Sequence, residues 1–86
     1  MRIFFHKNFK KKYKNLRRSE KEKFRERRDL FMQNPFNPIL NNHPLEGKYG
    51  GYRSINITGD LRLLYELIGN KTVLFITIDT HSNLYS

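Results

Sequence analysis

YRSINITGDLRLLYELIGNKTVLFITIDT, residues 52–80, is the stretch of this sequence that decides the fold. It contains three β-like runs, at about residues 52–57, 61–68 and 73–80. The pairs Gly59-Asp60 and Gly69-Asn70 separate these runs, and short glycine-containing pairs of this kind are typical of hairpin turns. The stretch therefore predicts an antiparallel meander of three strands.

Alternation within the three runs predicts which side chains face the core, because successive residues of a strand point to opposite faces of the sheet. We expect one apolar set to face the rest of the domain: Ile55, Ile57, Leu61, Leu63, Tyr65, Leu67, Leu74, Ile76 and Ile78. Leu64 and Phe75 then fall on the opposite face. The polar residues of that open face are Asn56, Arg62, Glu66, Thr77, Asp79 and His81. A polar sheet face with a histidine at its rim is a candidate functional site.

The chain before this stretch begins with a strand and a helix. Residues 2–6 alternate loosely and predict a first strand. Asn8 can cap a helix that runs to about Arg17. Apolar residues spaced three and four apart give this helix a buried face, made of Phe9, Tyr13 and Leu16.

A second helix follows directly. Ser19 and Glu22 have the spacing of a capping box, which predicts that this helix begins there. It runs to about Gln33 and ends before Pro35, because the residue preceding a proline disfavours the helical conformation. Residues 34–51 contain three prolines, four asparagines and three glycines, and this composition predicts a loop.

These elements follow the order β-α-α-β-β-β. The order predicts an α+β fold with a small, mainly antiparallel sheet and a two-helix hairpin packed on one of its faces. With 86 residues, the chain is long enough for one domain with one small core, so we expect residues 1–86 to form a single domain.

Positive charge is concentrated in the predicted hairpin. The net charge is +9, and residues 7–28 hold 12 of the 17 Lys and Arg against three glutamates, so this segment alone carries +9. A localised basic stripe suits a polyanion such as RNA, because binding releases counterions from the phosphates. The alternative is a helical face that only keeps the domain soluble. Our candidate RNA-binding residues on the hairpin are Lys10, Lys11, Lys12, Lys14, Arg17, Arg18, Lys21, Arg25 and Arg28.

The amino-acid composition limits the cellular compartment and the kinds of binding site that we expect for this chain. The chain has no cysteine, which rules out disulfides and thiolate metal sites and makes a reducing cytoplasm the expected compartment. The apolar run after Met1 is too short for a signal peptide or a membrane span. Glycine-rich phosphate loops and zinc-site spacings are absent from the sequence, so we expect no cofactor, no metal and no membrane partner.

Two histidines, an arginine and an aspartate supply the groups that cleave RNA by attack of its own 2′-hydroxyl. That reaction needs a base, an acid and a cation that stabilises the phosphate. His81 is our candidate acid, and either His43 or Asp60 is the base. Arg62, helped by Arg53, would stabilise the phosphate, because a guanidinium pairs with two phosphate oxygens and stays charged.

Each of these residues also has a simpler interpretation. His81 and His43 could be ordinary surface histidines, and an aspartate in a turn, such as Asp60, commonly bonds nearby backbone amides. Tyr85 could stack on a base. We assign His6 to structure.

Three motifs resemble the YafQ branch of the RelE superfamily, which comprises bacterial type II toxins of toxin–antitoxin pairs. They are His43-Pro-Leu-Glu-Gly-Lys-Tyr-Gly-Gly-Tyr-Arg53, Asp60 before a Leu-Leu-Tyr strand, and Thr80-His-Ser-Asn-Leu-Tyr85. The resemblance implies a ribosome-dependent endonuclease that cuts messenger RNA in the ribosomal A site and leaves a 2′,3′-cyclic phosphate. It also implies a cognate, acidic antitoxin protein as partner.

The resemblance also assigns roles by position. His43, Asp60 and His81 match the branch's catalytic residues, and Tyr85 matches its C-terminal aromatic residue. Asn56 stands where the branch usually has a histidine, so it could contact RNA but could not exchange a proton near neutral pH. Arg62 matches the strand arginine of the wider superfamily. Two alternatives stay open, namely a non-enzymatic ParE-like inhibitor of DNA gyrase and a plain RNA- or ribosome-binding module.

Overall fold

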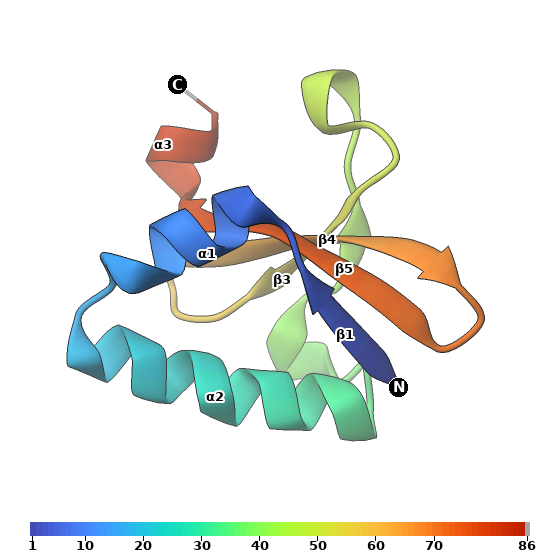
Figure 1. Cartoon of the computed structure of the whole chain (residues 1–86), viewed down its shortest axis with the longest axis horizontal. Coiled ribbons are helices and arrows are strands. Elements are labelled where there is room, and N and C mark those ends of the chain that lie inside the picture. The colour runs from blue at the N-terminus through green and yellow to red at the C-terminus, as the bar shows by residue number, and fades with distance from the viewer. Residues whose placement is uncertain (86) are drawn as a thin grey trace.

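The computed structural model describes residues 1–85, which form one five-stranded sheet with the strand order β1-β5-β4-β3-β2. Figure 1 shows β4 and β5 crossing the middle of the molecule, with β1 beside β5. The bounds are β1 (Arg2–Phe5), β2 (His43–Pro44), β3 (Arg53–Asn56), β4 (Leu61–Gly69) and β5 (Thr72–Thr80).

The predicted meander and the α+β class are confirmed. β3 pairs with β4 and β4 with β5, in both cases antiparallel, whereas β1 lies parallel to β5 at the sheet edge. The prediction that residues 34–51 form only a loop is wrong. This segment contains the two-residue strand β2, which pairs with β3, and two 3-10 turns, η1 (Pro38–Leu40) and η2 (Gly47–Tyr49).

The first helix, α1 (Lys7–Lys14), is shorter than predicted. Its cap is His6 rather than Asn8, because the His6 Nδ1 atom accepts the Asn8 backbone N–H at 3.0 Å. This contact confirms the structural role assigned to His6. The helix does not reach Arg17, since the amides of residues 15 and 16 bond to carbonyls three residues back and tighten the last turn.

The second helix, α2 (Arg18–Gln33), begins before the predicted capping box. Ser19 therefore lies inside the helix, and the Ser19–Glu22 prediction is wrong. Glu20 takes the capping role, since its Oε1 atom accepts the Arg17 backbone N–H at 2.8 Å. The helix ends at Gln33, as predicted from the following Asn34-Pro35 pair.

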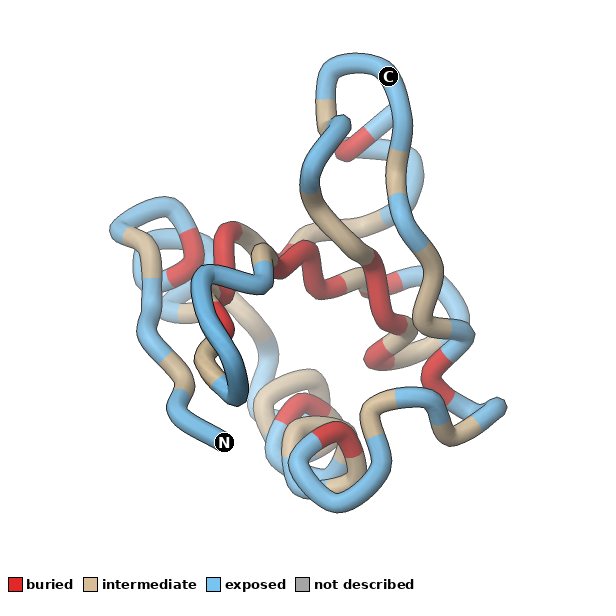
Figure 2. Tube along the Cα trace, turned by 90° about the vertical axis from the view of Figure 1, so that its right-hand side faces the viewer, coloured by how far each residue is buried: buried red, intermediate tan, exposed pale blue. Residues whose placement is uncertain are grey.

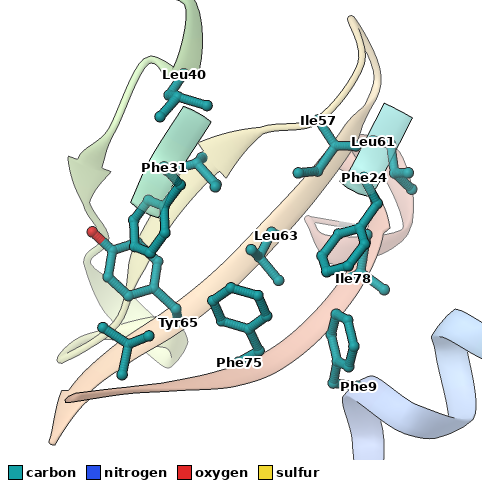
Figure 3. Packing of buried hydrophobic residues seen from close by; sticks show 12 residues of the cluster. Phe9, Phe24, Phe31, Leu40, Ile57, Leu61, Leu63, Tyr65, Phe75 and Ile78 are labelled. Atoms are coloured by element: carbon teal, nitrogen blue, oxygen red, sulfur yellow. The ribbon is translucent and has the colours of Figure 1, made fainter. Parts of the chain in front are cut away.

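Aromatic side chains build the main core, between the sheet and the two helices (Figure 3). Phe9 of α1 and Phe24 of α2 meet with ring centroids 5.4 Å apart, and both contact Phe75 of β5. At the other end of α2, Phe31 packs edge-on against Tyr65 at 4.9 Å. Figure 2 shows that buried positions line the inward sides of the elements, with exposed positions outside them.

A β-bulge between β4 and β5 changes the predicted alternation. The register shifts between Leu64 and Tyr65, which leaves Ile76 as an extra residue in β5. Phe75 consequently belongs to the helix-side core, while Ile76 and Leu74 lie in a separate cluster. A second shift follows Leu67, which is 61% exposed. The predicted orientations were therefore wrong for Leu67, Leu74, Phe75 and Ile76.

The separate cluster covers part of the sheet face that alternation left open. Leu64 and Ile76 are buried there beneath Leu84 of a short C-terminal helix, α3 (His81–Leu84). Tyr49 and its neighbours in residues 45–52 complete the cover. The Tyr49 hydroxyl donates a hydrogen bond to the Leu84 carbonyl at 3.0 Å. The cluster therefore attaches α3, and with it His81, to the sheet.

Candidate active site

A cavity of about 230 Å³ lies where β2, β3, β4 and α3 meet. Four distant parts of the sequence contribute to it, because the meander brings the strand ends and the loops to one side of the sheet (Figure 1). The structure thus places together four of the five predicted catalytic residues. The side chains that line the cavity are Asn41, His43, Ser54, Arg62, His81 and Tyr85.

His43 is held in a defined orientation by a local bond. Its Nδ1 atom lies 2.7 Å from the carbonyl oxygen of Asn41. Because a carbonyl oxygen can only accept, Nδ1 must carry the proton, so in the neutral ring Nε2 keeps its lone pair. Asn41 itself adopts the left-handed conformation, with φ of 48°, which asparagine tolerates better than most residues. The arrangement leaves Nε2 as the ring nitrogen that could accept a proton.

His81 is the first residue of α3 and is exposed to solvent. Its backbone N–H donates to the carbonyl of Asp60 at 2.9 Å, and the Thr80 hydroxyl caps the helix by accepting the Asn83 N–H at 3.1 Å. These bonds fix the backbone that carries the imidazole, while the ring itself stays accessible. An accessible imidazole can deliver a proton to a bound substrate.

Tyr85 follows the last turn of α3 and is 46% exposed. Its ring lies 4.8 Å from the His81 ring, centroid to centroid, and 5.8 Å from that of Tyr49 in an edge-on contact. One side of the Tyr85 ring thus packs against Tyr49 and His81, and the rest of the ring is exposed. Such a ring offers a stacking surface for a nucleic-acid base.

Arg62 lies in β4 and is half-buried. Its Nη1 atom donates to the carbonyls of Thr58 and Gly59, at 3.1 and 2.9 Å, in the β3–β4 turn. Within residues 1–85, no carboxylate forms an ion pair with this guanidinium. The turn therefore orients a cation whose charge is not neutralised, which suits a phosphate ligand.

Three further candidate residues lie outside the cavity. The Asp60 side chain is exposed in the β3–β4 turn, and the contribution of this residue is the carbonyl that accepts from His81. Arg53 donates through Nε to Asn42 Oδ1 at 2.9 Å and lies over the Phe36 ring. Asn56 lines a different pocket. The cavity thus favours His43 over Asp60 as the base.

Asn41 and Ser54 are lining residues that sequence reasoning missed. Ser54 was not considered functional, although His43 pairs with it directly across β2 and β3. Asn41 lies in the stretch predicted as loop. Its signal in the sequence is its position two residues before His43, where a left-handed turn can aim its carbonyl at the ring.

Comparison with known proteins identifies the family. The model of the family described as "Bacterial toxin of type II toxin-antitoxin system, YafQ" matches residues 1–86. The chain belongs to this family. No curated protein matches the sequence.

Solved structures of YafQ-family toxins share the fold. The crystal structure of YafQ from E. coli strain BL21(DE3) is 25% identical, covers 100% of both chains and superposes with a TM-score of 0.83. The toxin in the E. coli DinJ–YafQ toxin–antitoxin complex is 25% identical, with 98% and 96% of the two chains covered and a TM-score of 0.79. The Staphylococcus aureus YoeB–YefM complex, at 20% identity, 94% and 97% coverage and a TM-score of 0.75, shows the same fold.

The basic stripe of this YafQ-family toxin, residues 7–28, lies along α1 and α2. Most of its charged groups are exposed, and several pair with acids on their own helix, as Arg18 does with Glu22 at 3.4 Å. Lys21 lies over the Tyr13 ring, and Arg28 over that of Phe24. Exposed pairs of this kind contribute little stability, so their charges stay available to a polyanion.

Asp79 connects the basic stripe to α3, which carries His81. Alternation placed Asp79 on the open face, but its Oδ2 atom instead contacts the Lys12 ammonium of α1 at 3.1 Å. Its Oδ1 atom accepts from the Thr80 N–H at 2.8 Å and from the Asn83 amide at 3.0 Å. Partial burial raises the pKa of Asp79, but these hydrogen bonds and the Lys12 charge lower the pKa by more. The net pKa lies below its ordinary value, so the folded toxin favours the ionised carboxylate.

This pKa shift predicts a pH-dependent contribution to stability. Because the folded-state pKa is depressed, the contribution is complete above the unfolded value of 3.8 and is lost as pH falls through the folded-state pKa. We expect Asp79→Asn to lower the free energy of unfolding by roughly 0.5–1 kcal/mol at pH 7, allowing for the half-exposed Lys12. Urea unfolding should show that the difference in unfolding free energy between wild type and Asp79→Asn disappears in strongly acidic solution. A difference of equal size at every pH would contradict the assignment.

Within residues 1–85, no three His, Asp or Glu side chains are grouped so that they could hold a metal ion. None of the described helices combines the length and the apolar character that a membrane crossing requires.

Proposed function

We propose that this YafQ-family toxin is an endoribonuclease that cleaves messenger RNA by attack of the 2′-hydroxyl on the adjacent phosphate. The observation that carries the proposal is the cavity lined by His43, His81 and Arg62, in which Nε2 of His43 can accept a proton and no described carboxylate pairs with Arg62. A base, an acid and a phosphate-binding cation are the groups that this reaction requires.

Each of these groups has a role in the proposed cleavage reaction. His43 Nε2 removes the 2′-hydroxyl proton, and the oxygen attacks phosphorus. The bond from phosphorus to the 5′-oxygen breaks, and His81 in its protonated form gives that oxygen a proton. Arg62 pairs with the non-bridging oxygens as negative charge develops on them, and Tyr85 stacks on a base. The products are a 2′,3′-cyclic phosphate and a 5′-hydroxyl.

The substrate is messenger RNA on the ribosome. The cavity is small and open, with few groups to position a free RNA chain, whereas residues 7–28 alone carry a charge of +9. Contacts from this stripe to ribosomal RNA would hold the toxin beside a message that the ribosome already orients, and such positioning lowers the barrier to reaction. The toxin would then act in the cytoplasm.

A cognate antitoxin is the second proposed partner. The family description and the E. coli DinJ–YafQ complex support an antitoxin protein for this toxin as well. The charge of the basic stripe favours an acidic segment in that antitoxin.

Primer extension on a defined message in a purified translation system tests the proposed cleavage. We expect cuts at fixed positions within codons, present only with ribosomes and ending in a 2′,3′-cyclic phosphate. A message with one 2′-deoxynucleotide at the cut site is the matched control, and it should stay intact there. An uncut normal message with ribosome-bound toxin would favour a binding module, and DNA damage with intact messages would favour gyrase inhibition.

A further inference from the structure

A second pocket, which we name the edge pocket, lies at the open edge of β3. β2 pairs with β3 only at Ser54 and Arg53, so the strand edge beyond Ser54 has no partner from β2. Helix α2, turn η1 and the β3–β4 turn enclose a volume of about 320 Å³ at this edge. Its lining residues are Lys23, Arg27, Ile39, Asn56, Ile57, Thr58 and Gly59. The volume is at the lower end of the range for small-molecule sites.

Two cations from one face of α2 enter the edge pocket. Lys23 and Arg27 are four residues apart, so they lie on the same side of the helix, and both are partly buried. Lys23 lies 3.5 Å from Glu26, whereas Arg27 forms no ion pair within residues 1–85. A helix normally turns apolar residues towards its sheet, so two cations here indicate an anionic ligand.

Asn56 contributes a side-chain amide whose oxygen has no hydrogen-bond partner within residues 1–85. This Oδ1 atom is buried. Buried polar atoms in native proteins are nearly always paired, and an exception indicates a missing ligand or water. An asparagine amide offers both a donor and an acceptor, which is the pattern that reads the edge of a nucleic-acid base.

Arg62 joins the edge pocket to the active-site cavity. Its side chain lines the cavity, and its Nη1 atom bonds to the carbonyls of Thr58 and Gly59, which line the edge pocket. Asn56 is also the residue that faces Arg62 across β3 and β4. A single RNA strand with its phosphate at Arg62 would therefore bring a neighbouring nucleotide to the edge pocket.

We propose that the edge pocket binds the nucleotide next to the cleaved bond, with Asn56 on the base and with Lys23 and Arg27 on the phosphate. The proposal rests on the proposed ribonuclease function and adds a second contact with the same RNA strand. Ile39, which is 56% exposed, supplies apolar surface for the base to pack against. An asparagine at position 56 then contributes to the choice of the base beside the cut.

NMR titration with cleavage-resistant RNA tests the edge pocket directly. The probes are 2′-O-methyl oligonucleotides of one uniform sequence, a dinucleotide and a hexanucleotide. With the hexanucleotide, we expect the backbone amide of Gly59 and the side-chain amide of Asn56 to shift together with the His43 and His81 rings. Arg27→Glu should weaken hexanucleotide binding about tenfold, as expected for a lost charged contact. Lys71→Glu is the matched control, because it changes charge equally at an exposed position of the β4–β5 turn, outside residues 7–28 and both pockets, and its effect should be clearly smaller.

Three outcomes would overturn the edge pocket as a nucleotide site. The first is unmoved Gly59 and Asn56 signals while the His43 and His81 rings shift. The second is equal weakening by Arg27→Glu and Lys71→Glu, which would indicate general electrostatics alone. The third is an Arg27→Glu variant that loses antitoxin but not RNA, which would make the pocket a protein contact. Absence of cleavage by wild-type toxin on ribosomes would refute the proposed function, whereas unmoved Gly59 and Asn56 signals in a toxin that does cleave would refute the edge pocket alone.

Discussion

Replacing His81 with alanine is expected to lower the rate of message cleavage ~10²–10⁴-fold, the usual loss when a general acid is removed. The expected change is in rate rather than folding, because the His81 ring is exposed and its structural bonds come from the backbone. Primer extension on ribosome-bound messages measures the rate, and thermal unfolding of the variant checks the fold.

His6→Ala is the histidine control for this experiment. His6 caps α1 and lies outside the active-site cavity, so its loss should cost about 0.5–2 kcal/mol of stability and leave cleavage per folded molecule unchanged. If His81→Ala instead cuts as fast as wild type, the acid in the proposed reaction must be another group.

Replacing His43 with glutamine is the second change for which we expect a large effect. Glutamine cannot take up a proton near neutral pH, so the rate should again fall ~10²–10⁴-fold. Single-turnover cleavage measures this loss of rate.

Asp60→Asn separates the two candidate bases. The Asp60 carbonyl, which accepts from His81, is kept in this variant, and its carboxylate lies outside the cavity. We therefore expect the cleavage rate to stay within a few-fold of wild type. A severe loss with Asp60→Asn beside a mild one with His43→Gln would reverse the assignment.

The sequence was sufficient for the fold class because its strongest signals are local. Gly59-Asp60 and Gly69-Asn70 mark turns wherever two β-like runs flank them, and Asn34-Pro35 ends a helix by sterics alone. Helix starts were harder to place. Several polar residues near Ser19 could act as the cap, and a neighbouring glutamate took the role.

Alternation failed where the sheet departs from a regular ladder. The extra residue at Ile76 reverses the pattern within one strand, and no residue type marks the bulge in the sequence. Alternation also predicts which face of the sheet a side chain lies on, but not where on that face it lies. It therefore grouped Asn56 with His81 on one open face, whereas the two side chains line different pockets. The loop turn at Asn41, which orients His43, has no periodic signal at all.

The division of the apolar residues into two clusters has a consequence for how this toxin can be inactivated. The large aromatic core joins α1 and α2 to the sheet, whereas α3, which carries His81, packs through its own Leu84 on the small cluster around Leu64 and Ile76. A substitution could therefore abolish catalysis without unfolding the domain. If the toxin acts on ribosomes as proposed, a change confined to the small cluster should give a folded, inactive protein that still presents its basic surface and competes with the active toxin for the same ribosomes.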